Sequence, residues 1–220
     1  MAPQVKSKQR VADHGEVFTN EREVNAMLDL VKGETERIDS RFLEPACGNG
    51  NFLAPILERK LAVVTKRYKK SVAEWEKNAF VAVASVYGVE LLPDNVTECR
   101  VRLYKLFCGE YERIAKQKAS KRYLGAIQYV LSRNILCGDA LTLLQADGTP
   151  IVFSEWSMVM GSKVKRRDFR LDQMLDGTER QMSIFQSEWE YDEETNTMIP
   201  TPIQEYPLVD FYMVEEADAA

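Results

Sequence analysis

The sequence is poor in the residues that histidine-based catalysts and metal sites require. His14 is the only histidine among 220 residues, so imidazole chemistry has a single candidate. The cysteines form no CxxC pair, and their spacing therefore indicates neither a zinc site nor a disulfide framework. We expect no metal site, and we expect the four cysteines to be reduced and mostly buried. They are Cys47, Cys99, Cys108 and Cys137.

Long apolar runs are also missing. No segment approaches the roughly 18 consecutive apolar residues that cross a bilayer. The opening residues, MAPQVKSKQR, are polar and basic and contain no apolar stretch that could serve as a secretion signal. Hydrophobic residues nevertheless make up 45% of the chain, which is enough for a globular core. We therefore expect a cytoplasmic protein with no membrane partner.

Basic residues are scarce near the end of the chain. Residues 171–220 contain one basic residue, Arg180, and 13 acidic ones, whereas residues 1–170 contain 28 basic and 21 acidic ones. The body is net positive although the whole chain carries a formal charge of -5. A basic body is compatible with a nucleic-acid partner. The acidic end either forms a solvated surface or folds away from that partner.

Apolar periodicity predicts helices that alternate with short strands. Helices are expected over 21–31, from 51 through 84, from 93 onward and over 119–131. Strands are expected at 42–43, 86–91, 134–137, 151–153 and 208–214. Gly33 is placed to end the first helix. This order predicts an α/β fold with a mostly parallel sheet.

Three regions follow from these patterns. Residues 1–15 form a flexible basic leader, and residues 16–172 form the main domain. Residues 173–220 form an acidic extension that contains aromatic residues and is expected to make strands or a hairpin. Residues 183–191 alternate loosely within that extension.

The stretch RFLEPACGNGNFL places two glycines, Gly48 and Gly50, between a predicted strand and a predicted helix. Such a turn points backbone N–H groups at a ligand, and glycine lets the ligand approach the backbone. Leu53 stands where the dinucleotide fingerprint requires glycine or alanine, and the Gly-Lys-Ser/Thr of phosphate-binding loops is absent. The turn alone is therefore compatible with a ligand but neither establishes nor identifies one.

The residues around the turn narrow the choice of ligand. FLEPACGNGNFL resembles motif I, the cofactor-binding motif of the S-adenosylmethionine-dependent DNA adenine-N6 methyltransferases of restriction–modification systems. The resemblance implies a Rossmann-like methyltransferase core, complete or incomplete, with S-adenosylmethionine bound at the turn. The residues that it assigns to the cofactor here are Glu44, Pro45, Ala46, Cys47, Gly48 and Gly50.

An upstream segment resembles a second motif of the same family. HGEVFTNEREVNAMLDLV is similar to motif X, in which a phenylalanine and a threonine lie against the methionine part of the cofactor. The resemblance implies these contacts for Phe18 and Thr19. Asn20 stands where proline is usual. Without the resemblance, Phe18 would be read as a core residue.

Two downstream segments continue the family's order of motifs. VYGVELLPDNV implies that Glu90 accepts hydrogen bonds from the ribose hydroxyls, a task that suits an acceptor-only carboxylate, and that Leu91 packs against the adenine. NILCGDALTL implies that Asp139, with Ala140 beside it, takes the adenine amino group. Taken singly, Glu90 would be an exposed carboxylate at a strand end. Together the four segments cover roughly residues 14–143.

The resemblance ends before the family's catalytic motif. That motif, Asn/Asp/Ser-Pro-Pro followed by an aromatic residue, orients the amino group of an adenine that has left the duplex. No Pro-Pro occurs in this chain, and the corresponding place reads IVFSEWSMV. Ser154 and Trp156 match residue types that the motif permits. Glu155, however, stands where the prolines should be, and glutamate does not fix a carbonyl as proline does.

Three interpretations stay open. Ser154, Glu155 and Trp156 could form a variant active site. The chain could instead be the cofactor-binding part of a split methyltransferase, whose partner subunit carries the catalytic motif and recognises the target. It could also be a catalytically inactive cofactor- or DNA-binding regulatory module. The position of IVFSEW and KRRDF resembles segments that precede the catalytic motif in the broader group, which favours the split. A small-molecule or RNA methyltransferase is a weaker interpretation, because the combination of GEVFT and EPACGNGNF resembles the DNA-modifying group most.

The segment KVKRRDFRL is the strongest candidate for a DNA contact. Its basic residues could hold phosphates, and Phe169 could stack on a base. It could equally be a solvated loop that pairs with the acidic end of the chain. That end has too many aromatic residues for a purely disordered segment, so it could dock a partner or cover the basic face. The basic residues in question are Lys163, Lys165, Arg166 and Arg167.

Overall fold

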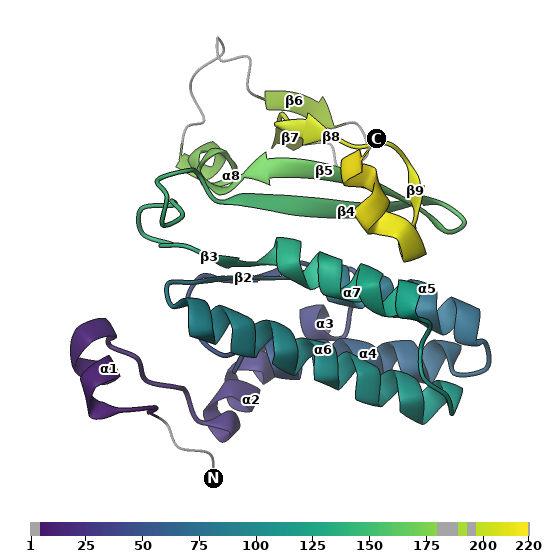
Figure 1. Cartoon of the computed structure of the whole chain (residues 1–220), viewed down its shortest axis with the longest axis horizontal. Helices are drawn as coiled ribbons and strands as arrows, with labels where there is room; N and C mark the ends of the chain where they lie inside the picture. The colour runs from purple at the N-terminus through teal and green to yellow at the C-terminus, as the bar shows by residue number, and fades with distance from the viewer. Residues whose placement is uncertain (1–4, 180–188, 193–196, 220) are drawn as a thin grey trace.

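The computed structural model describes residues 5–179, 189–192 and 197–219 (Figure 1). Its helices are α1 (Lys8–His14), α2 (Glu21–Leu30), α3 (Lys32–Thr35), α4 (Leu53–Tyr68), α5 (Val72–Ala84), α6 (Pro93–Ala115), α7 (Lys121–Asn134), α8 (Leu171–Glu179) and the 3-10 helix η1 (Phe211–Ala219). Its strands are β1 (Phe42–Glu44), β2 (Val86–Glu90), β3 (Ile135–Cys137), β4 (Val152–Met160), β5 (Lys163–Arg170), β6 (Trp189–Asp192), β7 (Thr197–Pro200), β8 (Gln204–Glu205) and β9 (Val209–Asp210). The chain therefore has the mixed α/β content that its sequence predicts.

The first three strands form a parallel sheet in the order β1-β2-β3. Phe42 pairs with Val86, and Gly88 pairs with Ile135. Two helices, α4 and α5, connect β1 to β2, and two more, α6 and α7, connect β2 to β3, as parallel strands require long crossovers. Because the strands are parallel and adjacent, their carboxyl ends lie at one edge of the sheet. Three of the four segments that the sequence assigns to a cofactor, those that follow β1, β2 and β3, leave from this edge.

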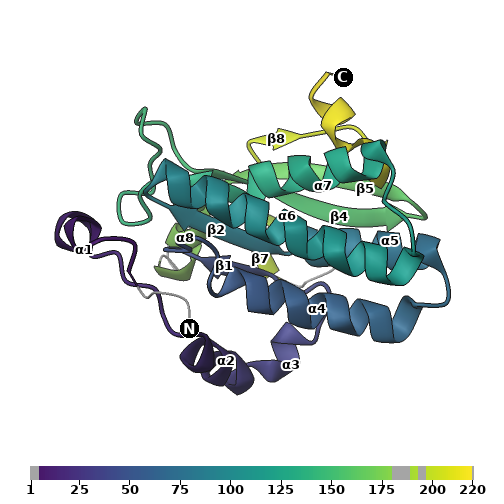
Figure 2. The same cartoon turned by 60° about the horizontal axis from the view of Figure 1, so that its bottom comes forward.

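The main core lies between the sheet and the helices. Helices α4, α6 and α7 run side by side, and their apolar faces close over β2 (Figures 1 and 2). Leu57, Leu103 and Ile127 represent the three helices there and are fully buried. A smaller cluster on the other face of β2 joins Tyr87 to Phe153 of β4. These two clusters fix the position of the β2 end, where Glu90 stands.

A second sheet is antiparallel. The β4 and β5 strands form a hairpin with Ser154 opposite Asp168, and both β8 and β9 pair with β5. The expectation of a mostly parallel sheet is therefore wrong beyond β3. The short turn at Gly161 is the physical reason, because a two-residue connection can join only antiparallel strands. The strand expected at 151–153 is instead the start of the nine-residue β4.

Two predicted helix boundaries are also wrong. Gly33, which was expected to end the first helix, lies inside α3, and the break falls at Val31, whose φ of -115° leaves the helical range. The single helical pattern expected from 51 to 84 is two helices. Ser71 adopts an extended conformation and its hydroxyl accepts a hydrogen bond from Glu74 N, which starts α5.

The described parts of both ends of the chain contain helices that the sequence did not predict. Within the predicted flexible leader, Ser7 caps α1 and Gly15 ends it with a φ of 63°. At the other end, the strand expected at 208–214 is limited to β9, and η1 follows it. Phe211 and Val214 of η1 are buried against the helical core. The alternation expected at 183–191 falls largely outside the described residues.

Candidate functional site

The glycine turn follows β1 directly and is tied to β2. Cys47 N donates to Val89 O (2.9 Å), and Gly50 N donates to Cys47 O (2.8 Å). The φ angles of Gly48 and Gly50 are 53° and 87°, in the left-handed region that favours glycine. A Cβ on Gly48 would lie 3.2 Å from the ring of Phe18. Glycine is therefore required here by backbone conformation and by close packing.

Glu90 ends β2 and turns its carboxylate toward the glycine turn. One oxygen, Oε2, accepts a hydrogen bond from Gly48 N (2.9 Å). The other, Oε1, accepts from Leu92 N (3.0 Å) and from Asn95 Nδ2 (3.2 Å). The residue is only 9% exposed, so its reading as an ordinary exposed carboxylate is wrong. Glu90 holds the glycine turn and the start of α6 in fixed relation.

Asp139 lies in the turn after β3, next to Glu90. Gly138 N donates to Glu90 O (3.0 Å), which places the turn at the same edge of the sheet. The Asp139 side chain accepts a hydrogen bond from Leu141 N (2.8 Å), and its backbone N–H donates to Leu144 O (2.9 Å). These bonds fix the carboxylate within a tight turn, as is usual for aspartate in such positions.

Phe18 and Thr19 approach the glycine turn from the N-terminal side. The ring of Phe18 lies against Gly48, as described above, and Thr19 O accepts a hydrogen bond from Asn51 Nδ2 (3.3 Å). Asn20, which departs from the family's proline, caps α2 by accepting a hydrogen bond from a backbone N–H of the first turn. The departure therefore keeps a helix start at this position.

These segments enclose one cavity of about 750 Å³. Eleven of the twelve residues that the sequence assigns to a cofactor line it, and the exception, Gly50, shapes the turn from outside. Those eleven are Phe18, Thr19, Glu44, Pro45, Ala46, Cys47, Gly48, Glu90, Leu91, Asp139 and Ala140. Ligand sites for small molecules measure about 300–1,000 Å³, so the cavity is large enough for a nucleoside-sized ligand.

The charged side chains that line the cavity are all acidic. Four carboxylates face the cavity, and among the described residues that line it there is no lysine or arginine. Burial raises the pKa of Glu44 above its usual value, although a hydrogen bond from Ala46 N acts in the opposite direction. The hydrogen bonds from Arg10 lower the pKa of Glu16. Such a lining suits a ligand that carries positive charge and hydrogen-bond donors, and it opposes a phosphate.

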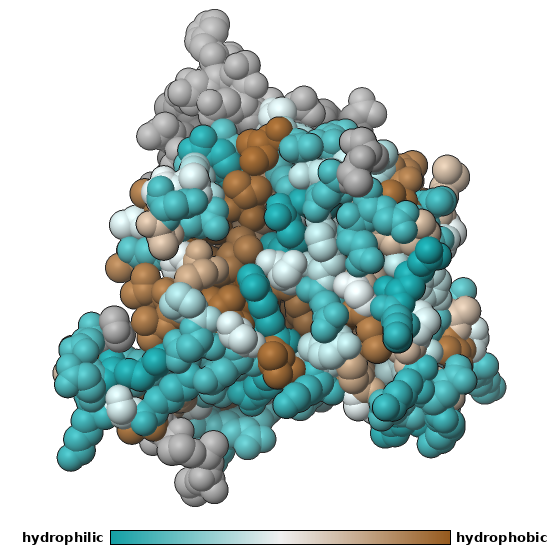
Figure 3. Space-filling model, viewed as in Figure 1, coloured by the Kyte–Doolittle hydropathy of each residue, from teal (hydrophilic) through white to brown (hydrophobic). Residues whose placement is uncertain are grey.

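Exposed apolar residues occur in the lining of the cavity and in the neighbouring part of the surface. Figure 3 shows apolar side chains gathered on the side where α8 and the loop between β3 and β4 lie in Figure 1. Leu141, which lines the cavity, is 95% exposed, and Leu144 and Met174 in this region are also exposed. Exposed apolar residues gathered in one place favour a contact with another molecule.

Sequence reasoning missed three polar residues of this site, Glu16, Asn51 and Asn95. They line the cavity together with the predicted residues. Asn95 follows the helix start at Pro93, and that start was recognised, but nothing in the sequence indicated that the amide would turn back to Glu90. No sequence signal could have identified Glu16, because its position depends on how the N-terminal segment folds over α6.

Ser154, Glu155 and Trp156 do not belong to the cavity. They lie within β4 and do not line it. Ser154 is buried and its hydroxyl donates to Asp168 Oδ1 (2.7 Å), while Trp156 Nε1 donates to a side chain at the end of α7. Glu155 forms an ion pair with Arg167 (2.6 Å). These contacts indicate a structural role for all three residues.

The basic segment lies on β5, where most of its charges are already paired. Arg166 is 1% exposed and its guanidinium binds Asp168, so it cannot reach a phosphate and its assignment to DNA is wrong. Phe169 is likewise buried, which excludes stacking on a base from this position. Lys165 pairs with Glu205 (2.7 Å) of β8. The expectation that the acidic end pairs with this segment is confirmed for that contact.

Comparisons with known proteins identify no relative. No family model matches the chain, and no match is found among curated proteins or solved structures. In the described part of the chain no helix is long and apolar enough to cross a membrane. The described residues also contain no group of three or more His, Cys, Asp or Glu side chains that could hold a metal ion.

Proposed function

We propose that this chain is an S-adenosylmethionine-binding, DNA methyltransferase-like protein that takes part in adenine-N6 methylation together with a partner subunit. The observation that carries the proposal is that four segments far apart in the sequence line one cavity at the carboxyl edge of a parallel sheet. In open α/β sheets ligands bind at this edge. The three parallel strands would be part of a Rossmann-like core.

The chemistry of the lining supports this cofactor over a nucleotide. S-adenosylmethionine has a sulfonium, an ammonium, a ribose diol and an adenine amino group, and each of these favours a carboxylate. Glu90 would accept from the diol and Asp139 from the amino group, with Leu91 against the ring. When bound, the cofactor supplies a methyl group activated by the positive sulfur. The left-handed turn at Gly48 lets such a ligand lie against the backbone.

The acceptor capacity of Glu90 sets a condition on binding. A carboxylate has about four acceptor sites, and three are occupied by Gly48 N, Leu92 N and Asn95 Nδ2. A ribose diol brings two donors, so one protein bond has to be shared or released. The bond from Asn95 is the longest of the three at 3.2 Å and is the one that would yield.

Catalysis would depend on a partner subunit. None of the described residues around the cavity reproduces a polar residue followed by two prolines and an aromatic, and Ser154 is engaged inside β4. We therefore assign the catalytic motif and target recognition to the partner, with DNA as the shared substrate. The same observation favours the second candidate, a catalytically inactive cofactor- or DNA-binding regulatory module. Transfer of labelled methyl groups to DNA, measured with candidate partner subunits present, separates the two.

Calorimetric titration with S-adenosylmethionine tests the proposal directly. We expect saturable binding by the wild-type chain and weaker binding by Asp139→Ala. Asp147→Ala is the matched control, because Asp147 lies in the same loop, does not line the cavity and bonds only within that loop. No binding by a folded wild-type sample would contradict the proposal, as would equal effects of the two substitutions.

A further inference from the structure

The N-terminal segment, residues 5–19, forms one wall of the cavity; we call it the strap. Residues 15–19 line the cavity itself. Val5, Lys6, Phe18 and Thr19 also line a neighbouring cavity of about 840 Å³. In Figure 1 the strap stands to one side of the helical core. Moving the strap would therefore open both cavities.

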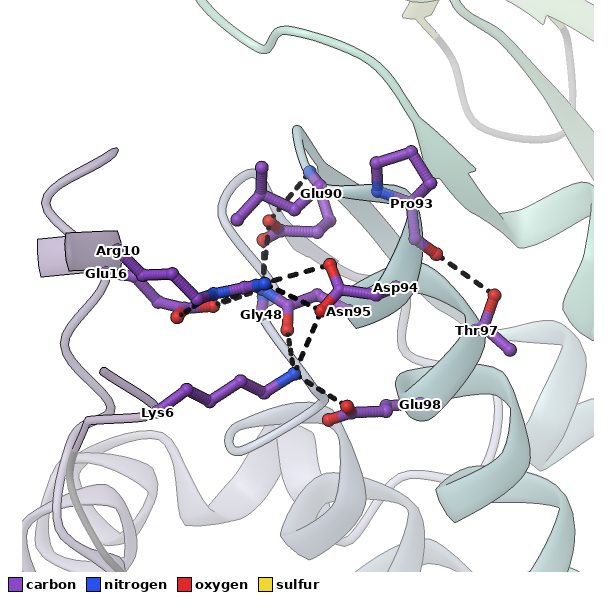
Figure 4. A network of polar contacts seen from close by, with 11 residues as sticks. Lys6, Arg10, Glu16, Gly48, Glu90, Pro93, Asp94, Asn95, Thr97 and Glu98 are labelled. Carbon is purple, nitrogen blue, oxygen red and sulfur yellow. Dashed lines mark hydrogen bonds and ion pairs between the residues drawn. The ribbon is translucent and has the colours of Figure 1, made fainter. Parts of the chain in front are cut away.

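The outer anchors of the strap are ion pairs with the first turns of α6 (Figure 4). Lys6 Nζ lies 2.6 Å from Glu98, and Arg10 Nη1 lies 2.8 Å from Asp94. The side chains of all four residues are between 25% and 50% exposed. Pairs of this kind are weak and are screened by salt. The outer anchors alone would hold the strap only loosely.

An inner bridge links the strap to Glu90 through a single residue, Asn95. Its Oδ1 accepts a hydrogen bond from Lys6 (2.7 Å), and its Nδ2 donates to Glu16 (2.6 Å) and to Glu90 (3.2 Å). Asn95 is 1% exposed. The orientation of the amide is set by its partners, because the ammonium needs an acceptor and the two carboxylates need donors. An aspartate at this position would place three carboxylates in contact.

We propose that Asn95 is a positioning residue. It couples closure of the strap over the cavity to the hydrogen bonds that the Glu90 carboxylate accepts. With Glu90 in place, Asn95 holds both ends of the strap, through Lys6 and Glu16. A ligand in the cavity would donate hydrogen bonds to Glu90 and contact Phe18 and Thr19 of the strap. It would therefore affect the strap both directly and through Asn95. The inference rests on the proposed function for the identity of that ligand, but the coupling itself does not depend on it.

Hydrogen exchange of the strap amides, followed by mass spectrometry, tests the coupling without any ligand. Glu90→Gln is expected to speed exchange in residues 8–19 by about fivefold or more, the effect of losing roughly one hydrogen bond. In an Asn95→Ala background the same substitution is expected to add nothing. The proposal is overturned if Glu90→Gln leaves strap exchange unchanged, or if its effect persists without Asn95.

A second variant and a ligand arm complete the experiment. Asn95→Asp is expected to speed strap exchange, whereas Asn78→Asp, a matched control on α5 whose amide donates only to a carbonyl of its own helix, is not. S-adenosylmethionine is expected to slow strap exchange in the wild type and less so in Asn95→Ala. If it binds without slowing exchange, the coupling proposal fails. If it does not bind, the proposed function fails, and the ligand-free comparison still decides the coupling.

Discussion

Two polar clusters of this chain contain the same kinds of side chain. They differ in whether any of their hydrogen-bonding capacity faces open space. In the antiparallel sheet, Arg166 and Asp168 are bound to each other and are almost fully buried. Burial works against the charge of Arg166, but hydrogen bonds to Asp168 raise its pKa above the usual value. At the edge of the parallel sheet, Glu90 faces a cavity, and its partners among the described residues are all neutral donors. A buried charge marks a binding site only where part of its bonding capacity faces open space.

The largest expected effect tests the structural side of this comparison. Arg166→Ala leaves Asp168 buried with a weaker set of partners, so we expect the free energy of unfolding to fall by about 3–5 kcal/mol. Urea denaturation measures it. Arg167→Ala is the control, because its pair with Glu155 is partly exposed and is expected to contribute about 1 kcal/mol or less. Equal losses of unfolding free energy in the two variants would mean that the buried Arg166 pair stabilises the sheet no more than the partly exposed Arg167 pair.

The next effect tests the binding side. Glu90→Ala is expected to weaken S-adenosylmethionine binding by about 1.5–3 kcal/mol, the usual contribution of a hydrogen bond to a charged group. Calorimetry provides the measurement. Glu205→Ala removes a partly exposed carboxylate from the antiparallel sheet and is expected to leave the affinity unchanged. A similar loss of affinity in both variants would show that general acidity, and not the position of Glu90, attracts the ligand.

Lys60 is another buried charge, and no carboxylate of the described residues pairs with it. Its ammonium donates to Arg37 O and Ile38 O (both 3.1 Å) and to Ser85 Oγ (2.8 Å), which fixes the entry into β1 and β2. Burial lowers the pKa of Lys60 from 10.5 to about 8. Between these values the unfolded chain binds more protons than the folded one, so this group makes the free energy of unfolding rise with pH.

The pH dependence of Lys60 is measured as a difference between two proteins. The stability of the wild type relative to Lys60→Met is expected to increase from pH 8 to pH 10 in urea denaturation. Taking the difference removes the titration of cysteine and tyrosine side chains that both proteins share. If the difference in stability stays flat or falls with pH, the carbonyl oxygens keep the ammonium charged despite its burial. Lys60 would then resemble Arg166, which keeps its charge through its hydrogen-bond partners.

Sequence alone predicted the parallel half of the molecule well because its signals are local. The apolar runs at β1, β2 and β3, the glycine turn and the helix starts each depend on a few adjacent residues. The family resemblance assigned Glu90 and Asp139 to one site, and the parallel strands that precede them end at one edge. The close approach of Phe18 to Gly48 depends on contacts across thirty residues and was not predicted, although the family resemblance assigned both residues to the cofactor.

The antiparallel half could not be predicted because its determinants are distant in sequence. Arg166 looks like a surface charge until Asp168, Ser154 and Asp218 are placed around it. The segment from Lys163 to Arg170 reads as a basic loop, yet every second side chain turns inward once it pairs with β4. The bridge through Asn95 has the same origin, since Lys6 and Glu16 of the strap lie far from Asn95 in the sequence.

The smallest expected effect decides whether the two clusters are independent. Glu155 lies beside Ser154 and Trp156, and its carboxylate pairs with Arg41 just before β1 and with Arg167. The pair with Arg41 links the antiparallel sheet to the strand that leads into the glycine turn. Glu155→Gln is expected to lower stability by about 1 kcal/mol and to leave S-adenosylmethionine affinity within about twofold, because the side chain is partly exposed and lies outside the cavity. Paired denaturation and calorimetry measure both values. A large loss of affinity with little loss of stability would place Ser154, Glu155 and Trp156 in the site and restore the interpretation of a variant active centre.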